Sequence, residues 1–245
     1  MGGQADRRIG GWVFIRRAVT SAGILLSAYP PSRLAAQVGY EPGHSPYRDI
    51  PRGGVALITV GYLGGSRGSV GVGISGGPTG GLRYETKLGG AIGVSFGVAY
   101  AQTTRFVVDP TKDAASRKSG PYDNDVILAD AGLQLVLTGK KTWHGLAPYF
   151  GGAVGVALGG GSPLDSSGYD FGTKFTVMPD AGVRWYPARR LSVRADFRAV
   201  LWKLKYPVEY KQQLSPDGTT VLPLTAALDE YTWHPWATIG VGWTF

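Results

Sequence analysis

The sequence predicts an all-β protein, folded as an eight-stranded antiparallel up-and-down transmembrane β-barrel. Three observations predict this class. Apolar residues alternate with small or polar residues over runs of about ten residues, which is the period of a β-strand. The connections between these runs are alternately short and long. The chain holds 39 glycines and only 17% charged residues, where a water-soluble domain usually carries about 25%.

The residue types on the two faces of each run favour lipid on the outside of the barrel. In the run 191–201 every odd position is apolar, whereas the even positions include Arg194, Asp196 and Arg198. In the run 91–100 bulky apolar residues oppose alanine, glycine and serine. Small and charged faces suit a narrow, crowded interior, and bulky faces suit lipid. The apolar faces are about as long as the roughly 9–11 residues that a tilted transmembrane strand needs.

The N-terminus has the three-part layout of a secretory signal peptide over residues 1–36. A basic start from Arg7 to Arg17 precedes the uncharged run 18–28, and Leu34-Ala35-Ala36 resembles a small-residue cleavage site. The alternative is a frayed N-terminal helix. Residues 37–52 are rich in proline and glycine and are interpreted as a periplasmic lead-in segment, with the barrel over 53–245.

Eight runs are expected as strands. They are 55–64, 78–88, 91–108, 125–139, 146–160, 173–187, 191–210 and 233–245. The register of the first two stays open, because the stretch VGVGI at 70–74 could extend either of them. Short turns on one side and longer loops on the other are typical of bacterial outer-membrane barrels.

Nine charged residues have the parity of the barrel interior and form the expected lumen charge network. They are Arg83, Glu85, Lys87, Asp130, Asp180, Arg184, Arg194, Asp196 and Arg198. Eight strands leave an interior that side chains can fill, and charges there need partners. We therefore expect ion pairs that plug the lumen, with a gated narrow pore or a small-ligand cavity as the alternative. Small residues on the inward faces would make room for the long arginines: Gly93, Gly151, Ala153 and Gly155.

No catalytic, cofactor-binding or metal-binding residues are expected. The chain has no cysteine, which excludes a disulfide framework and Cys-based metal sites. The three histidines, His44, His144 and His234, are scattered, and no serine is placed beside His234, Asp229 or Glu230. The glycine-rich stretches lack the GK[ST] of a phosphate-binding loop. We therefore expect no enzyme.

The net charge of +8 does not predict a nucleic-acid partner. Residues 1–36 supply half of it, with five arginines against Asp6. The remaining excess is ordinary for a chain of this length, and no basic stripe accompanies it.

The chain ends WATIGVGWTF, in which Ile239, Val241, Trp243 and Phe245 alternate with small or polar residues. Together with the export signal and the eight amphipathic runs, this ending resembles the small outer-membrane β-barrels of the OmpA/OmpX type. The resemblance covers about residues 53–245 and is one of architecture. It implies a monomer in the bacterial outer membrane, surrounded by outer-membrane lipid. It also implies that the barrel-assembly machinery reads these four residues as a C-terminal assembly signal.

The expected function is a structural or surface-exposed role with a mostly plugged, polar lumen. A narrow passive channel for small solutes is the first alternative, and a lipid-modifying outer-membrane enzyme is the second. The loops 109–124 and 211–232 are long enough to recognise a partner, but their composition names no ligand.

Overall fold

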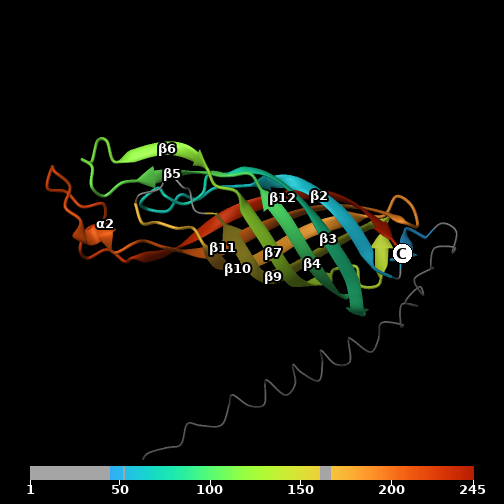
Figure 1. Ribbon diagram of the computed structural model, residues 1–245. Helices are drawn as coiled ribbons and strands as arrows, with labels where there is room; N and C mark the ends of the chain where they lie inside the picture. The colour runs from blue at the N-terminus through green and yellow to red at the C-terminus, as the bar shows by residue number, and fades with distance from the viewer. Residues whose placement is uncertain (1–44, 52, 161–166) are drawn as a thin grey trace, which may run out of the picture. The chain divides into compact units, whose positions relative to one another are not determined.

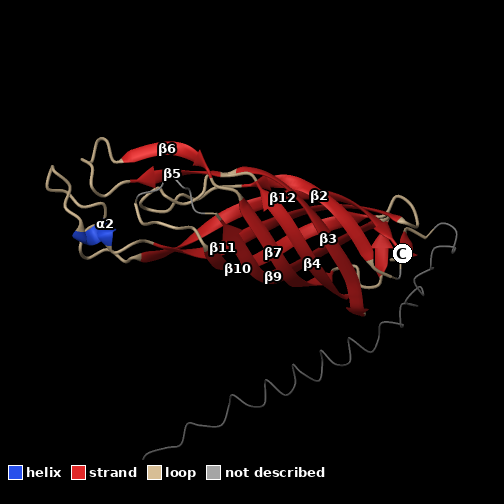
Figure 2. Cartoon of the chain, in the orientation of Figure 1, coloured by secondary structure: helices blue, strands red, loops and turns tan. Residues whose placement is uncertain are grey.

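Eight antiparallel strands close into a barrel in the computed structural model, which describes residues 45–51, 53–160 and 167–245 (Figures 1 and 2). Each strand pairs with the next along the chain, and the last pairs with the first, so the sheet has no open edge. The barrel strands are β2 (Val55–Leu63), β3 (Gly77–Gly89), β4 (Ile92–Ala101), β7 (Val126–Val136), β9 (Leu146–Gly159), β10 (Thr173–Trp185), β11 (Leu191–Lys205) and β12 (Asp229–Thr244). The predicted fold class is confirmed.

Side-chain parity follows the alternation of the sequence. Arg194, Asp196 and Arg198 on β11 are buried in the barrel, while Phe197 is exposed on its outer surface. A slip of this strand by one residue would turn both arginines into lipid, at about 2–4 kcal/mol for each one near the membrane midplane. In the two strands whose register was open, Leu57 of β2 pairs with Arg83 of β3, and both point inward.

The outer surface is an apolar belt. Its large exposed side chains include Ile58, Leu82, Phe96, Leu133, Phe150, Val154, Phe175, Phe197 and Ile239. On β12 the stretch from Trp233 to Trp243 measures about 25 Å along the barrel axis at the usual rise and tilt of such strands. That height matches the hydrocarbon layer of a membrane. No helix among the described residues is long and apolar enough to span a bilayer.

The predicted strand 91–108 is wrong beyond Ala101. On one side β7 begins at Val126, which is opposite Ala101, and on the other side β3 offers one further hydrogen bond, from the Gln102 amide to the Pro78 carbonyl at 3.0 Å. The chain instead forms a separate hairpin from β5 (Thr104–Val108) and β6 (Lys118–Asp123), which was not predicted. Thr103 and Asn124 hold its base, since the Asn124 amide donates to the Thr103 carbonyl at 2.9 Å.

The predicted strand 191–210 ends early, at Lys205. Pro207 follows, which lacks a backbone N–H and has a fixed φ, and the short helix α2 (Glu209–Gln212) comes next. The strand β12 begins at Asp229, four residues before the predicted start at 233, because Lys205 on the long β11 pairs with Asp229. The stretch 70–74 extends neither strand. It is a loop with Gly71 at a φ of 86°, and Val72 and Ile74 are buried.

The barrel has two unlike ends. The short-turn end holds the connections 90–91, 137–145 and 186–190 together with the chain's last residue. The loop end holds 64–76, 102–125, 167–172 and 206–228, and Figure 1 shows β5, β6 and α2 on the side opposite the C-terminus.

An additional two-stranded pairing lies at the short-turn end. The strand β1 (Tyr47–Asp49) pairs with β8 (Lys141–Trp143), so part of the expected lead-in segment contacts the barrel. Ile50 then packs into an apolar cluster with Val136, Ala147 and Tyr149. The expected signal peptide and the first part of the lead-in lie outside the described residues.

Candidate functional site: the charged lumen

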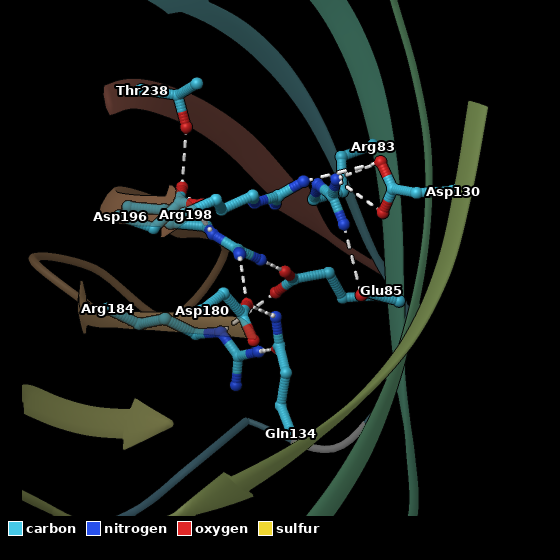
Figure 3. A network of polar contacts seen from close by, with 11 residues as sticks. Arg83, Glu85, Asp130, Gln134, Asp180, Arg184, Asp196, Arg198 and Thr238 are labelled. Atoms are coloured by element: carbon cyan, nitrogen blue, oxygen red, sulfur yellow. Dashed lines mark hydrogen bonds and ion pairs between the residues drawn. The ribbon is translucent and has the colours of Figure 1, made fainter. Parts of the chain in front are cut away.

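Eight of the nine predicted lumen charges meet in one network inside the barrel (Figure 3). Four are arginines and four are carboxylates, so the network is neutral in sum. All are buried, and Arg194 is fully so. They come from β3, β7, β10 and β11: Arg83, Glu85, Asp130, Asp180, Arg184, Arg194, Asp196 and Arg198.

Asp130 joins the arginines on two sides of the lumen. The Arg83 guanidinium donates to both Asp130 oxygens at 2.8 Å and to the Ser95 hydroxyl at 3.1 Å. From the other side, Arg198 donates to Asp130 at 3.3 Å. This carboxylate therefore connects β3 and β11 across the lumen.

Asp196 is the best-satisfied carboxylate of the network. It accepts from Arg194 Nε at 3.0 Å, from Arg198 Nε at 2.8 Å and from the Thr238 hydroxyl at 2.6 Å. Charge-assisted hydrogen bonds of this kind are the strong ones. Asp196 thereby fixes the two arginines that precede and follow it on the inward face of β11.

Arg194 and Arg184 bind the remaining carboxylates. Arg194 forms ion pairs with Glu85 and, at 3.6 Å, with Asp180. Arg184 Nε lies 2.9 Å from Glu85, and its Nη2 donates to the Gln134 side chain. The Gln134 amide in turn donates to Asp180 at 3.1 Å.

Neutral partners of the network were missed by sequence reasoning. Ser95, Gln134 and Thr238 each supply a hydrogen bond to a charged member. Their signal in the sequence is weak, because it is only an uncharged polar side chain at an inward parity.

Two aromatic rings pack against the arginines. The Tyr149 ring lies 4.7 Å from the Arg184 guanidinium and 4.9 Å from that of Arg194. The Trp236 ring lies 5.0 Å from the Arg198 guanidinium, and its indole N–H donates to Thr79 at 3.0 Å. Such cation–π contacts gain strength where water is excluded.

Glycines make the room that the network occupies, in part at positions other than expected. A Cβ on Gly97 would lie 2.5 Å from Arg83 Nη2, and one on Gly151 would lie 2.8 Å from an Asp180 oxygen. On Gly155 it would meet the Asp130 backbone at 3.0 Å. The expectation for Gly93 is wrong, since a Cβ there would meet only the Thr86 carbonyl, at 3.5 Å. Ala153 contacts the apolar cluster of the loop end instead.

Lys87, the ninth predicted residue, is placed differently from the other eight. It is only partly buried, near the short-turn end, and its ammonium donates to the Ile50 carbonyl at 3.2 Å. The structure therefore gives it a role in holding the N-terminal segment against the barrel.

Two cavities lined by described residues of the lumen are small. The cavity beside Arg83, Asp130, Arg198 and Trp236 has a volume of about 10 Å³, which is room for about one water molecule. The cavity between Glu85, Arg184 and Tyr186 has about 20 Å³.

Apolar clusters cover the network at both ends. Ile50 and its neighbours lie at the short-turn end. At the loop end a larger cluster includes Trp202, Phe171, Tyr206 and Tyr210, to which the loops contribute. Apolar side chains therefore pack on both sides of the charged centre along the barrel.

His234 lies within the barrel mouth and does not face lipid. It is fully buried, stacks on Trp202 with centroids 3.9 Å apart, and contacts the Thr232 hydroxyl at 2.9 Å. The Ser66 amide donates to its Nδ1 at 3.2 Å, which anchors the loop 64–76.

The two acidic residues near His234 in sequence are engaged elsewhere. Asp229 pairs with Lys203 at 2.5 Å, while Glu230 accepts from the Ser69 amide and from the Tyr206 hydroxyl. Burial, together with the hydrogen bond to Glu230, raises the pKa of Tyr206 to about 12. The hydrogen bonds and the ion pair of these two carboxylates described above therefore go to other partners than His234. The described part of the chain shows no cluster of three metal-ligating side chains.

The four residues of the expected C-terminal signal all face outward. Ile239, Val241, Trp243 and Phe245 are 59%, 53%, 55% and 68% exposed. The Phe245 amide donates to the Gly54 carbonyl at 3.1 Å, and its ring stacks on Tyr84. They form one apolar row along the outer face of β12 and the residue that follows it, beside β2, with which β12 closes the barrel.

A closed barrel with an apolar belt and a buried polar interior is a membrane-spanning β-barrel. Comparison with solved structures finds proteins of similar architecture. The outer-membrane protein OprG from Pseudomonas aeruginosa is 13% identical, covers 80% of this chain and 98% of its own, and has a TM-score of 0.51. The chain therefore has the fold of the small eight-stranded outer-membrane barrels, which confirms the resemblance, and this fold indicates the bacterial outer membrane.

Other similar structures are more distant. Neisserial surface protein A has a TM-score of 0.46 at 12% identity, covering 82% of this chain and 98% of its own. The N-terminal β-barrel domain of Pseudomonas aeruginosa OprF has 0.45 at 12%, covering 80% and 99%. No protein-family model and no curated protein sequence matches the chain.

Proposed function

We propose that the chain is an outer-membrane barrel with a structural and surface-exposed role, and that its lumen does not conduct. The observation that carries the proposal is the filled lumen, in which four arginines and four carboxylates pair across the barrel under apolar clusters at both ends. An ion crossing it would have to displace these pairs, and breaking one buried pair costs about 3–5 kcal/mol.

The loop end supports the surface-exposed part of the proposal, because its loops are joined to one another. The Ala114 amide donates to Asp217 at 2.8 Å, and Arg117 donates to the Thr220 carbonyl at 3.0 Å. The Phe106 ring lies between Arg67 and Lys118, with cation–π distances of 4.8 and 4.5 Å. The hairpin β5–β6 is thus held to two neighbouring loops.

The partners follow from the same features. We propose that the barrel is a monomer, because β12 pairs with β2 and the closed barrel itself has no open strand edge for another chain. Its surroundings would be outer-membrane lipid, which the apolar belt fits. The barrel-assembly machinery would recognise the row Ile239, Val241, Trp243 and Phe245.

Conductance across planar bilayers tests the closed lumen. We expect no steady openings from the wild-type chain. Steady wild-type openings whose size changes with Arg194→Ala or Asp196→Ala, but not with Lys112→Ala on an exposed loop, would favour the narrow channel and contradict the proposal.

Two further experiments address assembly and enzymatic activity. Phe245→Ala should lower the fraction of heat-modifiable barrel in cells while the purified chain still refolds in detergent, with Leu224→Ala as an exposed apolar control. Unchanged assembly of Phe245→Ala in cells would contradict the proposal that the assembly machinery recognises this residue. Mass spectrometry of lipid A with and without the protein should show the same species, and a new mass would support the lipid-modifying enzyme.

A further inference from the structure

The charged side chains of the short-turn end are almost all basic. Its described connections carry five exposed cationic side chains against one acidic side chain, Asp49. The cationic residues are Arg48, Lys140, Lys141, Arg189 and Arg190. The described connections of the loop end hold similar numbers of both signs, so the excess of positive over negative charge lies at the short-turn end.

Three segments that are distant in sequence bring these residues together. The pairing of β1 with β8 sets Arg48 opposite Thr142, next to Lys141. The Tyr186 amide donates to the Gly145 carbonyl at 2.9 Å, which joins the connection 137–145 to the turn 186–190. The Thr244 amide then donates to the Arg190 carbonyl at 2.8 Å, which joins this turn to the end of β12.

Half-exposed tryptophans lie beside the charges. Trp143, Trp185 and Trp243 are each about half exposed, and Leu146 pairs with both Trp143 and Trp185. The Arg190 guanidinium lies over the Trp243 ring at 6.0 Å. Tryptophan prefers the level of lipid headgroups, so the basic side chains are at the height of the phosphates.

We infer that this basic rim, defined as Arg48, Lys140, Lys141, Arg189 and Arg190, binds the headgroups of anionic phospholipids in the leaflet around the short-turn end. Arginine matches a phosphate with paired N–H donors, and lysine supplies a mobile point charge. Each such residue near an anionic surface contributes about a five-fold gain in affinity at low ionic strength. Asp49 offsets one of the five charges at most. The inference rests on the proposed membrane location and adds a lipid class to it.

Lipid selectivity of the full chain in vesicles tests the inference. Spin-labelled phosphatidylglycerol and spin-labelled phosphatidylcholine are compared by electron paramagnetic resonance in phosphatidylcholine vesicles. The variants are Arg189→Gln with Arg190→Gln, Lys140→Gln with Lys141→Gln, and all four together. Lys112→Gln with Lys211→Gln is the matched control, since it removes the same two charges from the loop end.

We expect the wild type to prefer phosphatidylglycerol, and each rim pair to lower the relative association constant about two-fold or more, because the signal averages over all lipids around the barrel. The four-residue variant should lose the preference, and 0.5 M salt should weaken it in the wild type, since salt screens surface charges. The control should keep the wild-type value.

Three results would overturn the inference. They are the absence of a wild-type preference, a preference that survives in the four-residue variant, and an equal loss in the loop-end control. Heat modifiability is measured on every sample. A barrel that inserts but shows no selectivity contradicts the lipid site alone, whereas a chain that does not insert contradicts the proposed membrane location as well.

Discussion

Asp196→Asn is the substitution that tests the lumen network most directly. The change keeps the shape of the side chain and removes its charge. The amide keeps one acceptor oxygen and replaces the other by an NH2 donor, so one of the hydrogen bonds from Arg194 and Arg198, at 3.0 and 2.8 Å, is lost. Four buried arginines then face three carboxylates. Breaking a buried pair by removing one partner costs about 3–5 kcal/mol, and we expect a loss in this range in the free energy of unfolding.

Urea titration of the refolded barrel in lipid vesicles measures this loss through tryptophan fluorescence, checked by the shift of the folded band on gels. Asp113→Asn in the exposed hairpin loop is the matched control for charge, and surface changes of this type usually stay within about 0.5 kcal/mol.

A double variant separates charge imbalance from general damage. Asp196→Asn with Arg198→Gln removes one charge of each sign from the network, so it should lose less than the sum of the two single variants. A loss below about 1 kcal/mol for Asp196→Asn alone would refute the reasoning, because that is the value of a solvated ion pair and would mean that water fills the lumen.

The other predictions concern space, the barrel mouth and the loops. Gly97→Ala should destabilise the barrel by about 1–3 kcal/mol through overpacking, because its Cβ would lie 2.5 Å from Arg83. Gly93→Ala, whose Cβ would meet only the Thr86 carbonyl at 3.5 Å, should leave the stability unchanged. Equal urea midpoints for the two variants would contradict this. His234→Gln should speed tryptic cleavage after the exposed Arg67, because the stack on Trp202 and the bond from Ser66 hold that loop; an unchanged cleavage rate would count against the anchor. Hydrogen bonds from Thr219 and Ala114 hold the pKa of Asp217 below its usual range. A lowered pKa means that its stabilisation is present above the ordinary pKa and is lost as the pH falls through the lowered one. Asp217→Asn should therefore speed tryptic cleavage after Arg117 at pH 7, where the wild-type carboxylate is ionised, and an unchanged rate would contradict this contact.

Much of the barrel is predictable because its decisive signal is local. Lipid on one face and a crowded lumen on the other require alternation along each strand, and this requirement puts Arg194, Asp196 and Arg198 inside and Phe197 outside without knowledge of any neighbour. The same signal places the apolar row that ends at Phe245. It fails at the loop end, where Thr104–Val108 keeps the alternation of a strand but pairs outside the barrel.

The partners of the inward charges depend on closure of the sheet. Parity places Glu85 inside, but its pairing with Arg184 and Arg194 requires β3 to face β10 and β11 across the lumen. The relative stagger of the strands also decides that Gly97, and not Gly93, lies beside Arg83. The strand β1 has three residues, too few for a period, and its pairing with β8 was not foreseeable.

The sequence by itself determined the class of fold, the number of barrel strands, the face that each strand turns to lipid and the charges that lie inside. Only the tertiary structure decided which of these charges meet, how the lumen is covered, and that Arg48, Lys141 and Arg190 share one end of the barrel. The physical reason is the difference in sequence separation between the two kinds of interaction. Alternation is imposed on neighbours along the chain by the membrane and the lumen, whereas contacts across the barrel and between turns arise from closure and stagger, which no short stretch of sequence contains.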